Sequence, residues 1–180
     1  MKNKKFSTAF FILISLFTVY VTLLAYWVLF DGSFGRTGIS NLQNTNFELS
    51  RRYFSAHGNL VPFATVWEFV KGVFTGDVSF KAFAVNIFGN IAVFVPFGFF
   101  LPKLFKRQRR LLTFVCTVAI IAVCIEALQF LLLTGSPDID DLILNLFGGW
   151  TGYVITRAVF KKCKFSIFPV TFLRFEKYYI

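Results

Sequence analysis

The chain has 180 residues, of which 56% are hydrophobic and only 16% charged, and its mean hydropathy is +0.66. A soluble domain averages about 45–50% apolar and about 25% charged residues, and the excess here lies in runs long enough to span a bilayer. The composition therefore excludes an ordinary soluble domain, and the net charge of +10, gathered at the ends of the apolar runs, favours membrane orientation over nucleic-acid binding.

The first predicted element is a transmembrane helix over residues 6–30, preceded by the basic segment MKNKK. The run of 25 residues exceeds the core of a cleavable signal peptide, which spans about 7–15 residues. A polar loop over residues 31–81 follows. Within it, one helical stripe predicts a short helix lying on the membrane surface, with a loop helix packed on the protein as the alternative. The stripe consists of Phe63, Val66, Trp67, Val70 and Phe74.

Three more spans are predicted over residues 82–102, 111–133 and 142–160, followed by a tail over residues 161–180. Basic residues precede the first span, separate the second from the third and follow the fourth, so all three groups fall on one side of a four-span bundle. The positive-inside rule then predicts that both termini are cytoplasmic and that the loop 31–81 is extracytoplasmic. The predicted fold is a single all-α integral membrane domain over residues 1–180.

Polar side chains recur at similar depth in three of these spans. Each lies roughly 12 Å or less from the outer end of its span, at a helical rise of about 1.5 Å per residue. They are Asn86, Asn90, Glu126, Gln129 and Asn145. Because ionisable groups within a span usually face a bundle interior or a water-filled cavity, this pattern predicts a polar pocket that opens outward, with Glu126 at its floor. The alternative is that a protonated Glu126 holds the helices together by a hydrogen bond to Asn86 or Asn90.

Three of the nine acidic residues crowd the segment SPDIDDLILN at the start of the fourth span. A stripe with steps of 3, 4, 3 and 4 joins Asp138, Asp141, Asn145, Gly148 and Gly152. The stripe places Asp138 and Asp141 at the rim of the pocket and leaves Asp140 as a plain surface charge. The alternative is that Asp138 and Asp141 cap the start of the fourth span.

Two glycines and a proline are expected to shape the helix packing. Gly148 and Gly152 form a small-xxx-small pair that allows another helix to approach closely. Pro96 is expected to kink the second span.

The remaining reactive residues give little indication of catalysis. Cys116, Cys124 and Cys163 have no spacing typical of a metal or disulfide framework, and His57 is isolated in a polar loop. No catalytic residue is assigned, and Glu126 is the one candidate acid or base. No cofactor is expected, with a divalent cation at Asp138 and Asp141 as the alternative if the protein is an enzyme.

The segments NLVPF, NIFGNIAVFVPFGFFLP, EALQ and DIDDLILNLFGGWTGY resemble the VanZ-like family of bacterial membrane proteins, over residues 51–157. Many members have an arginine where this chain has Gly135, so the resemblance does not imply an arginine–carboxylate pair at the rim. The positions that match the family motifs are Asn86, Asn90, Pro96, Gly98, Glu126, Gln129, Asp138, Asp141, Asn145 and Gly148.

The resemblance implies a cell-envelope protein of the bacterial plasma membrane, because the founding member confers low-level resistance to the glycopeptide teicoplanin. The function expected first is binding of a lipid-linked cell-wall precursor, or of the lipid moiety of the drug, in the outward pocket. The alternatives are an enzyme that modifies such a lipid and a proton-coupled carrier that works through Glu126. Membrane lipids are the expected partners, nucleic acid is not, and a carrier with so few spans would need a homo-oligomer.

Overall fold

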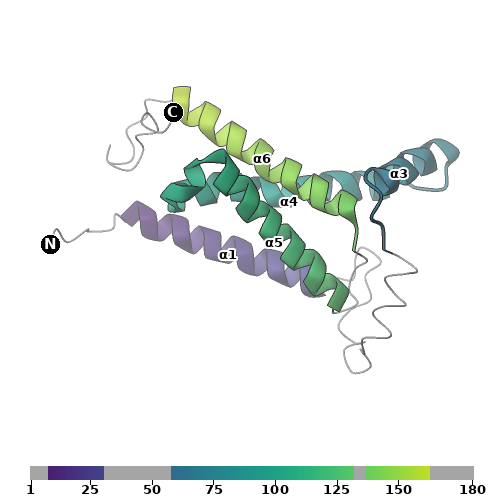
Figure 1. Ribbon diagram of the computed structural model, residues 1–180, viewed down its shortest axis with the longest axis horizontal. Coiled ribbons are helices and arrows are strands. Elements are labelled where there is room, and N and C mark those ends of the chain that lie inside the picture. The colour runs from purple at the N-terminus through teal and green to yellow at the C-terminus, as the bar shows by residue number, and fades with distance from the viewer. Residues whose placement is uncertain (1–7, 31–57, 132–136, 163–180) are drawn as a thin grey trace.

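The computed structural model describes residues 8–30, 58–131 and 137–162, and these residues are helical nearly throughout (Figure 1). The elements are α1 Thr8–Phe30, α3 Ala64–Thr75, α4 Phe80–Leu104, the 3-10 helix η3 Lys106–Arg109, α5 Leu111–Leu131 and α6 Ile139–Lys162. Pairing of extended backbone in the described ranges is confined to one isolated bridge, between Asn59 and Asp138. The predicted all-α class is confirmed.

Three helices are long and apolar enough to cross a membrane, over Thr8–Trp27, Phe80–Leu104 and Leu111–Leu131. They correspond to the first three predicted spans. Helix α6 has 24 residues, about 36 Å at the helical rise, but the structure does not place it among the three. Two aspartates in its first turn and the glycines in its middle lower its apolar content, so the fourth span stays a prediction.

The centre of the molecule is the pair α4 and α6, which pack through glycines. A Cβ added at Gly148 would overlap the backbone carbonyl of Ile91, and one at Gly152 would overlap that of Val95. From the other side, a Cβ at Gly98 would overlap the backbone of α6 at Tyr153. The close approach predicted from the small-xxx-small pair is confirmed, and α4 is the helix that approaches.

Helices α1 and α5 flank this pair and complete an aromatic core. Phe97 of α4 is 3% exposed and packs edge-on against Phe17 and Tyr20 of α1, with ring centroids 6.0 and 5.3 Å away. On the other flank, Phe114 of α5 stacks on Tyr153 of α6 at 4.7 Å. The core therefore joins all four long helices.

Helix α4 runs through Pro96 as one helix of 25 residues. A proline inside a helix removes one backbone hydrogen bond and disturbs the preceding turn. The Tyr20 hydroxyl of α1 donates a hydrogen bond to the carbonyl of Val93 in that turn. A side chain from the neighbouring helix thus adds a hydrogen bond to α4 in the turn that Pro96 disturbs.

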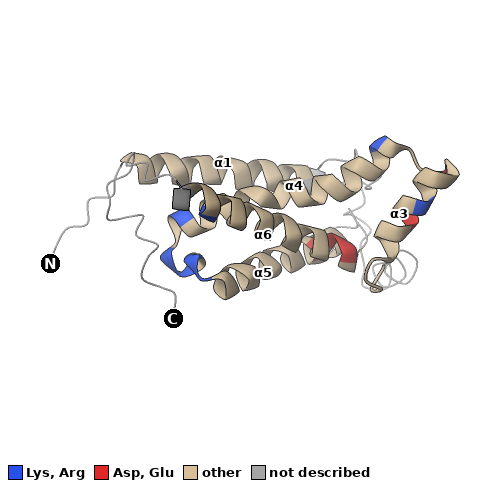
Figure 2. Cartoon of the chain, turned by 90° about the horizontal axis from the view of Figure 1, so that it is seen from above, with Lys and Arg blue, Asp and Glu red and all other residues tan. Residues whose placement is uncertain are grey.

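The two ends of the bundle carry opposite charge (Figure 2). Acidic residues gather where α6 begins, close to α3, and basic residues gather at the turn between α4 and α5. The first residues of α1 and the last residues of α6 lie toward the basic end. The ends of α1 and α6 next to the other two predicted basic groups thus lie toward the basic turn, and the orientation of the termini stays a prediction.

Helix α3 confirms the short helix expected before the second span, and it projects beyond the start of α6 (Figure 1). Its apolar stripe is open. Phe63 is 62%, Trp67 57% and Phe74 88% exposed, so little of this stripe packs on the rest of the described chain.

Candidate functional site

The start of α6 is fixed by Asp138, which is its N-cap residue. One carboxylate oxygen, Oδ1, accepts a hydrogen bond from the backbone N–H of Asp140 at 2.8 Å, as a capping aspartate does. The same oxygen accepts a second bond from the side-chain amide of Asn59 at 3.1 Å. The capping role considered for Asp138 is therefore confirmed, and its partner is a residue 79 positions earlier.

Asn59 ties the segment NLVPF to this turn by backbone and side chain together. Its N–H donates to the carbonyl of Pro137, and its own carbonyl accepts from the N–H of Ile139, both at 3.0 Å. Its side chain accepts from the N–H of Val61 at 2.9 Å and donates to the Thr65 hydroxyl at 2.9 Å. We call residues 59–66 and 137–141, joined in this way, the clasp.

Asp140 lies in the middle of the clasp and is only 1% exposed. Its two carboxylate oxygens accept hydrogen bonds from the N–H groups of Phe63 and Val66, at the start of α3. Carboxylates are stabilised at helix N-termini, and α3 has no side-chain cap from its own N-cap residue. Asp140 supplies that cap from another part of the chain.

The expectation that Asp140 is a plain surface charge is therefore wrong. The prediction assumed that α6 has a single neighbouring helix, on the side of Asp138 and Asp141. Residues 59–66 of the clasp cover the side that carries Asp140. Helix α6 also begins at Ile139, three residues before the expected start of the span at 142. Asp140 thus stands inside the first helical turn, where a second helix can reach it.

Asp141 contacts a different helix, α4. Its Oδ1 accepts a hydrogen bond from the side-chain amide of Asn90 on α4, the residue directly before Ile91, whose carbonyl lies against Gly148. The structure thus brings together two of the predicted pocket residues, Asn90 and Asp141. The three aspartates hold three different elements, because Asp138 caps α6, Asp140 caps α3 and Asp141 binds α4.

The other predicted site residues lie inside the bundle. Gln129 and Asn145 are each 4% exposed. The carbonyl oxygen of the Asn86 side chain is buried and has no hydrogen-bond partner among the described residues, and Oε2 of Glu126 is buried as well. Buried polar atoms are normally hydrogen-bonded, so the oxygen of Asn86 is a candidate contact for a ligand that donates a hydrogen bond.

The predicted rim does not gather carboxylates for a metal ion in the described ranges. Asp138 and Asp141 meet different elements, through Asn59 and Asn90, and no group of three or more histidine, cysteine, aspartate or glutamate side chains that could hold a metal occurs there. Cys116 and Cys124 are exposed free thiols. His57, Gly135 and Cys163 lie outside the described residues.

Sequence reasoning missed the roles of two positions that hold the clasp together, Asn59 and Asp140. The signal for Asn59 was the segment NLVPF, in which an asparagine precedes a proline turn and a helix. Asp140 could have been suspected because Phe63, in front of Ala64, has no side chain that can cap a helix. The N–H groups at the start of α3 therefore need an acceptor from another part of the chain.

Comparison with known proteins relates this arrangement to one family. The family model described as VanZ/LLP1 matches residues 17–161, a range that includes the clasp, α4, α5 and nearly all of α6. The chain is similar to Protein VanZ of Enterococcus faecium, with 26% identity over 137 residues that cover 76% of this chain and 68% of that protein. No solved structure matches the chain.

Proposed function

This chain belongs to the VanZ/LLP1 family, and on that premise we propose that it is a cell-envelope membrane protein that lowers susceptibility to teicoplanin-type glycopeptides. It acts by binding a lipid-linked cell-wall precursor, or the lipid moiety of the drug, in a polar pocket that opens to the outer leaflet. The founding family member suggests the class of function, and the buried polar atoms of this chain suggest the candidate contacts.

The proposed topology has four spans, with α6 as the fourth and both termini on the cytoplasmic side of the plasma membrane. Two observations support it. The basic turn lies toward the end where α1 begins and α6 ends, and α6 is about as long as the other helices. In this topology the clasp and α3 lie at the outer surface, where the exposed Phe63, Trp67 and Phe74 reach the lipid interface.

The observation that carries the pocket is the Asn86 side-chain oxygen, buried and without a hydrogen-bond partner among the described residues. An unsatisfied buried acceptor costs about 1–3 kcal/mol, and a ligand hydroxyl or amide N–H would recover that cost. Sugar and peptide groups of a lipid-linked precursor carry many such donors. Glu126, with one buried carboxylate oxygen on α5, is the second proposed contact.

The clasp has a structural role in this proposal. Asp138 and Asp141 were expected at the pocket rim, and their hydrogen bonds to Asn59 and Asn90 make them supports for the outer end of the bundle. The enzyme alternative would use the same two carboxylates to hold a cation. Their hydrogen bonds lead to two different elements, through Asn59 and Asn90, so binding without catalysis is the simpler proposal.

The test is a teicoplanin susceptibility assay in a strain that lacks the gene and carries plasmid-borne variants. Asn86→Leu and Glu126→Gln should lower the inhibitory concentration to that of the deletion strain, at unchanged protein levels in the membrane. Glu68→Gln is the matched control, since Glu68 is an exposed carboxylate on α3. Full resistance with both pocket variants would refute the pocket, and full resistance in the deletion strain would refute the function.

A further inference from the structure

Residues 60–63, directly in front of α3, form an exposed turn made of apolar side chains alone, which we call the apolar turn. Leu60 and Val61 are each 65% exposed, and Pro62 and Phe63 are exposed as well. The turn lies outside the three apolar spans, so contact of a span with the bilayer interior does not explain it. Adjacent exposed apolar side chains of this kind mark an interaction surface.

The N–H groups of the apolar turn are bonded within the chain. The N–H of Val61 donates to the side chain of Asn59 at 2.9 Å, and that of Ala64 donates to the carbonyl of Val61 at 3.2 Å. The N–H of Phe63 donates to the carboxylate of Asp140, and the proline before it has no N–H. Unpaired N–H groups are costly in a lipid phase, and the turn presents none between Val61 and Ala64.

The backbone of Phe63 indicates that the shape of the turn serves a purpose. Its φ is 65°, and it is the one non-glycine residue with positive φ in the described ranges. A bulky L-residue rarely adopts this left-handed conformation. The buried Asp140 holds the Phe63 N–H in place, while the Phe63 side chain stays exposed. Strained backbone that the surrounding structure maintains is a sign of a functional surface.

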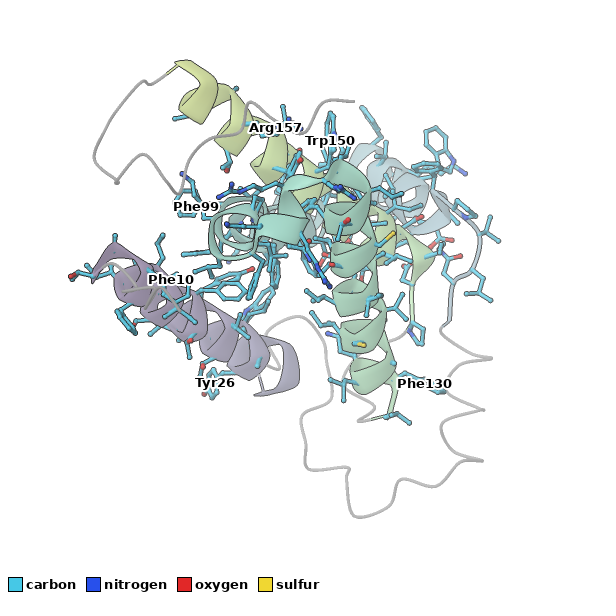
Figure 3. All side chains as sticks on the ribbon, turned by 60° about the vertical axis from the view of Figure 1, so that its left-hand side comes forward. Phe10, Tyr26, Phe99, Phe130, Trp150 and Arg157 are labelled. Atoms are coloured by element: carbon cyan, nitrogen blue, oxygen red, sulfur yellow. The ribbon has the colours of Figure 1, made fainter. Side chains whose placement is uncertain are left out.

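Helix α3 continues this surface across the end of the bundle. Figure 2 shows α3 turned across the direction of the long helices, at the end where α6 begins, and Figure 3 shows side chains of α3 that project away from the bundle. Trp67, one turn after Phe63, is exposed, and the ammonium of Lys71 lies over its ring at 5.5 Å from the centroid. Tryptophan and lysine side chains are typical of the boundary between lipid and water.

The composition and the position of the surface indicate its partner. Residues 59–67 contain no charged side chain, so the partner is apolar. The end of α3 at Thr75 is five residues before the start of α4 at Phe80. An extended chain covers at most about 18 Å over that distance, at about 3.6 Å per residue. Helix α3 therefore lies next to the end of an apolar span, where the surface of the same membrane is within reach.

We propose that the apolar turn and Trp67 insert into the lipid interface of the membrane that the long helices cross. The clasp fixes the shape of the turn through Asp140, so insertion needs little further ordering of the backbone. The proposal extends the topology proposed above, and it requires neither the polar pocket nor a particular side of the membrane. Its test measures contact with lipid and not drug susceptibility, so the two proposals can fail separately.

The test measures quenching of Trp67 fluorescence in the full-length protein, in phosphatidylcholine vesicles brominated at one depth of the acyl chain. Trp27 and Trp150 are replaced by phenylalanine, which leaves one of the three tryptophans. We expect stronger quenching by bromine near the headgroup than near the chain end, and shielding from aqueous acrylamide. Phe63→Gly should lower the lipid quenching by about twofold or more, because it removes an inserted aromatic side chain. The variant keeps the turn, since glycine adopts positive φ readily.

Phe105→Gly is the matched control, because it removes an exposed phenylalanine at the opposite end of the bundle and should leave Trp67 quenching unchanged. Full access of acrylamide to Trp67 with little lipid quenching would place the turn in water. Shielding from both quenchers would mean that a second copy of the chain covers it. Either result overturns the proposal, as does equal lipid quenching in Phe63→Gly and its parent. Should Phe63→Gly fail to fold, the quenching profile of the parent decides by itself.

Discussion

The two ends of α6 use charged residues in contrasting ways. At its start, each aspartate meets backbone or amide N–H groups of the same chain, so the negative charge is taken up within the clasp. At its end, Arg157 donates to the hydroxyl of Tyr153 and lies over its ring, and that hydroxyl donates to the carbonyl of Arg109 in the basic turn. The acidic end is therefore held by hydrogen bonds to three separate carboxylates, and one tyrosine links the basic end. Substitutions at the clasp should lower stability more than a substitution at the basic end.

The largest expected effect lies between the two ends, where α4 and α6 touch. Gly148→Ala places a Cβ against the backbone carbonyl of Ile91, and the two helices must separate, which strains both ends together. We expect a loss of about 3 kcal/mol in the free energy of unfolding, measured by reversible denaturation in mixed micelles.

Gly89→Ala is the matched control on α4, because a Cβ at Gly89 meets nothing within 4 Å. This variant should be neutral or stabilising by up to about 1 kcal/mol, since alanine favours the helix. If Gly148→Ala and Gly89→Ala behave alike, α4 and α6 are not packed as closely as the structure places them.

The next effect in size tests the clasp alone. Asp140→Ala removes the cap of α3 and leaves the N–H groups of Phe63 and Val66 without their acceptor, at a cost of about 2–3 kcal/mol. Hydrogen exchange should rise in α3 and stay unchanged at the basic turn. Glu68→Ala, at an exposed acid on α3 itself, is the control. Protected amides in α3 of Asp140→Ala would contradict the capping role.

These two positions also show what the sequence could predict. The pairing of Gly148 and Gly152 was visible because a helix repeats its faces at fixed steps, and one neighbour explains the pattern. The role of Asp140 was not visible, because it depends on residues 59–66 reaching a face of α6 that the same periodicity assigned to solvent. Contacts between segments some 79 positions apart leave no periodic signal in either segment.

The membrane spans show a second limit of prediction from sequence, which concerns the ends of helices. Apolar runs predicted three helices that the structure places within two residues of the expected ends wherever those ends are described. Helix α6 begins three residues before the predicted start of the fourth span, because the capping residue Asp138 determines where the helix begins. Hydropathy locates the apolar core of a helix, whereas its caps locate its ends.

A smaller effect is expected for a single hydrogen bond of the clasp. A double-mutant cycle over Asn59→Ala and Asp138→Ala should give a coupling energy of about 1 kcal/mol, because the Asn59 amide donates directly to the Asp138 carboxylate. The same cycle over Asn59→Ala and Asp141→Ala is the control, since the bond described for Asp141 leads to Asn90. Equal coupling energies in both cycles would contradict the separate hydrogen-bond partners of Asp138 and Asp141.

The smallest effect on stability should come from the basic end, and it sharpens the contrast most. Tyr153→Phe keeps the stack on Phe114 and removes the hydroxyl that joins Arg157 to the carbonyl of Arg109, which should cost about 1 kcal/mol. Tyr20→Phe, which removes another buried hydroxyl bond to a carbonyl, should cost about as much. Only Tyr153→Phe should raise hydrogen exchange at the turn between α4 and α5, because its hydroxyl donates to the carbonyl of Arg109 in that turn. If both variants leave exchange at the turn unchanged, the Tyr153 hydroxyl does not hold it in place.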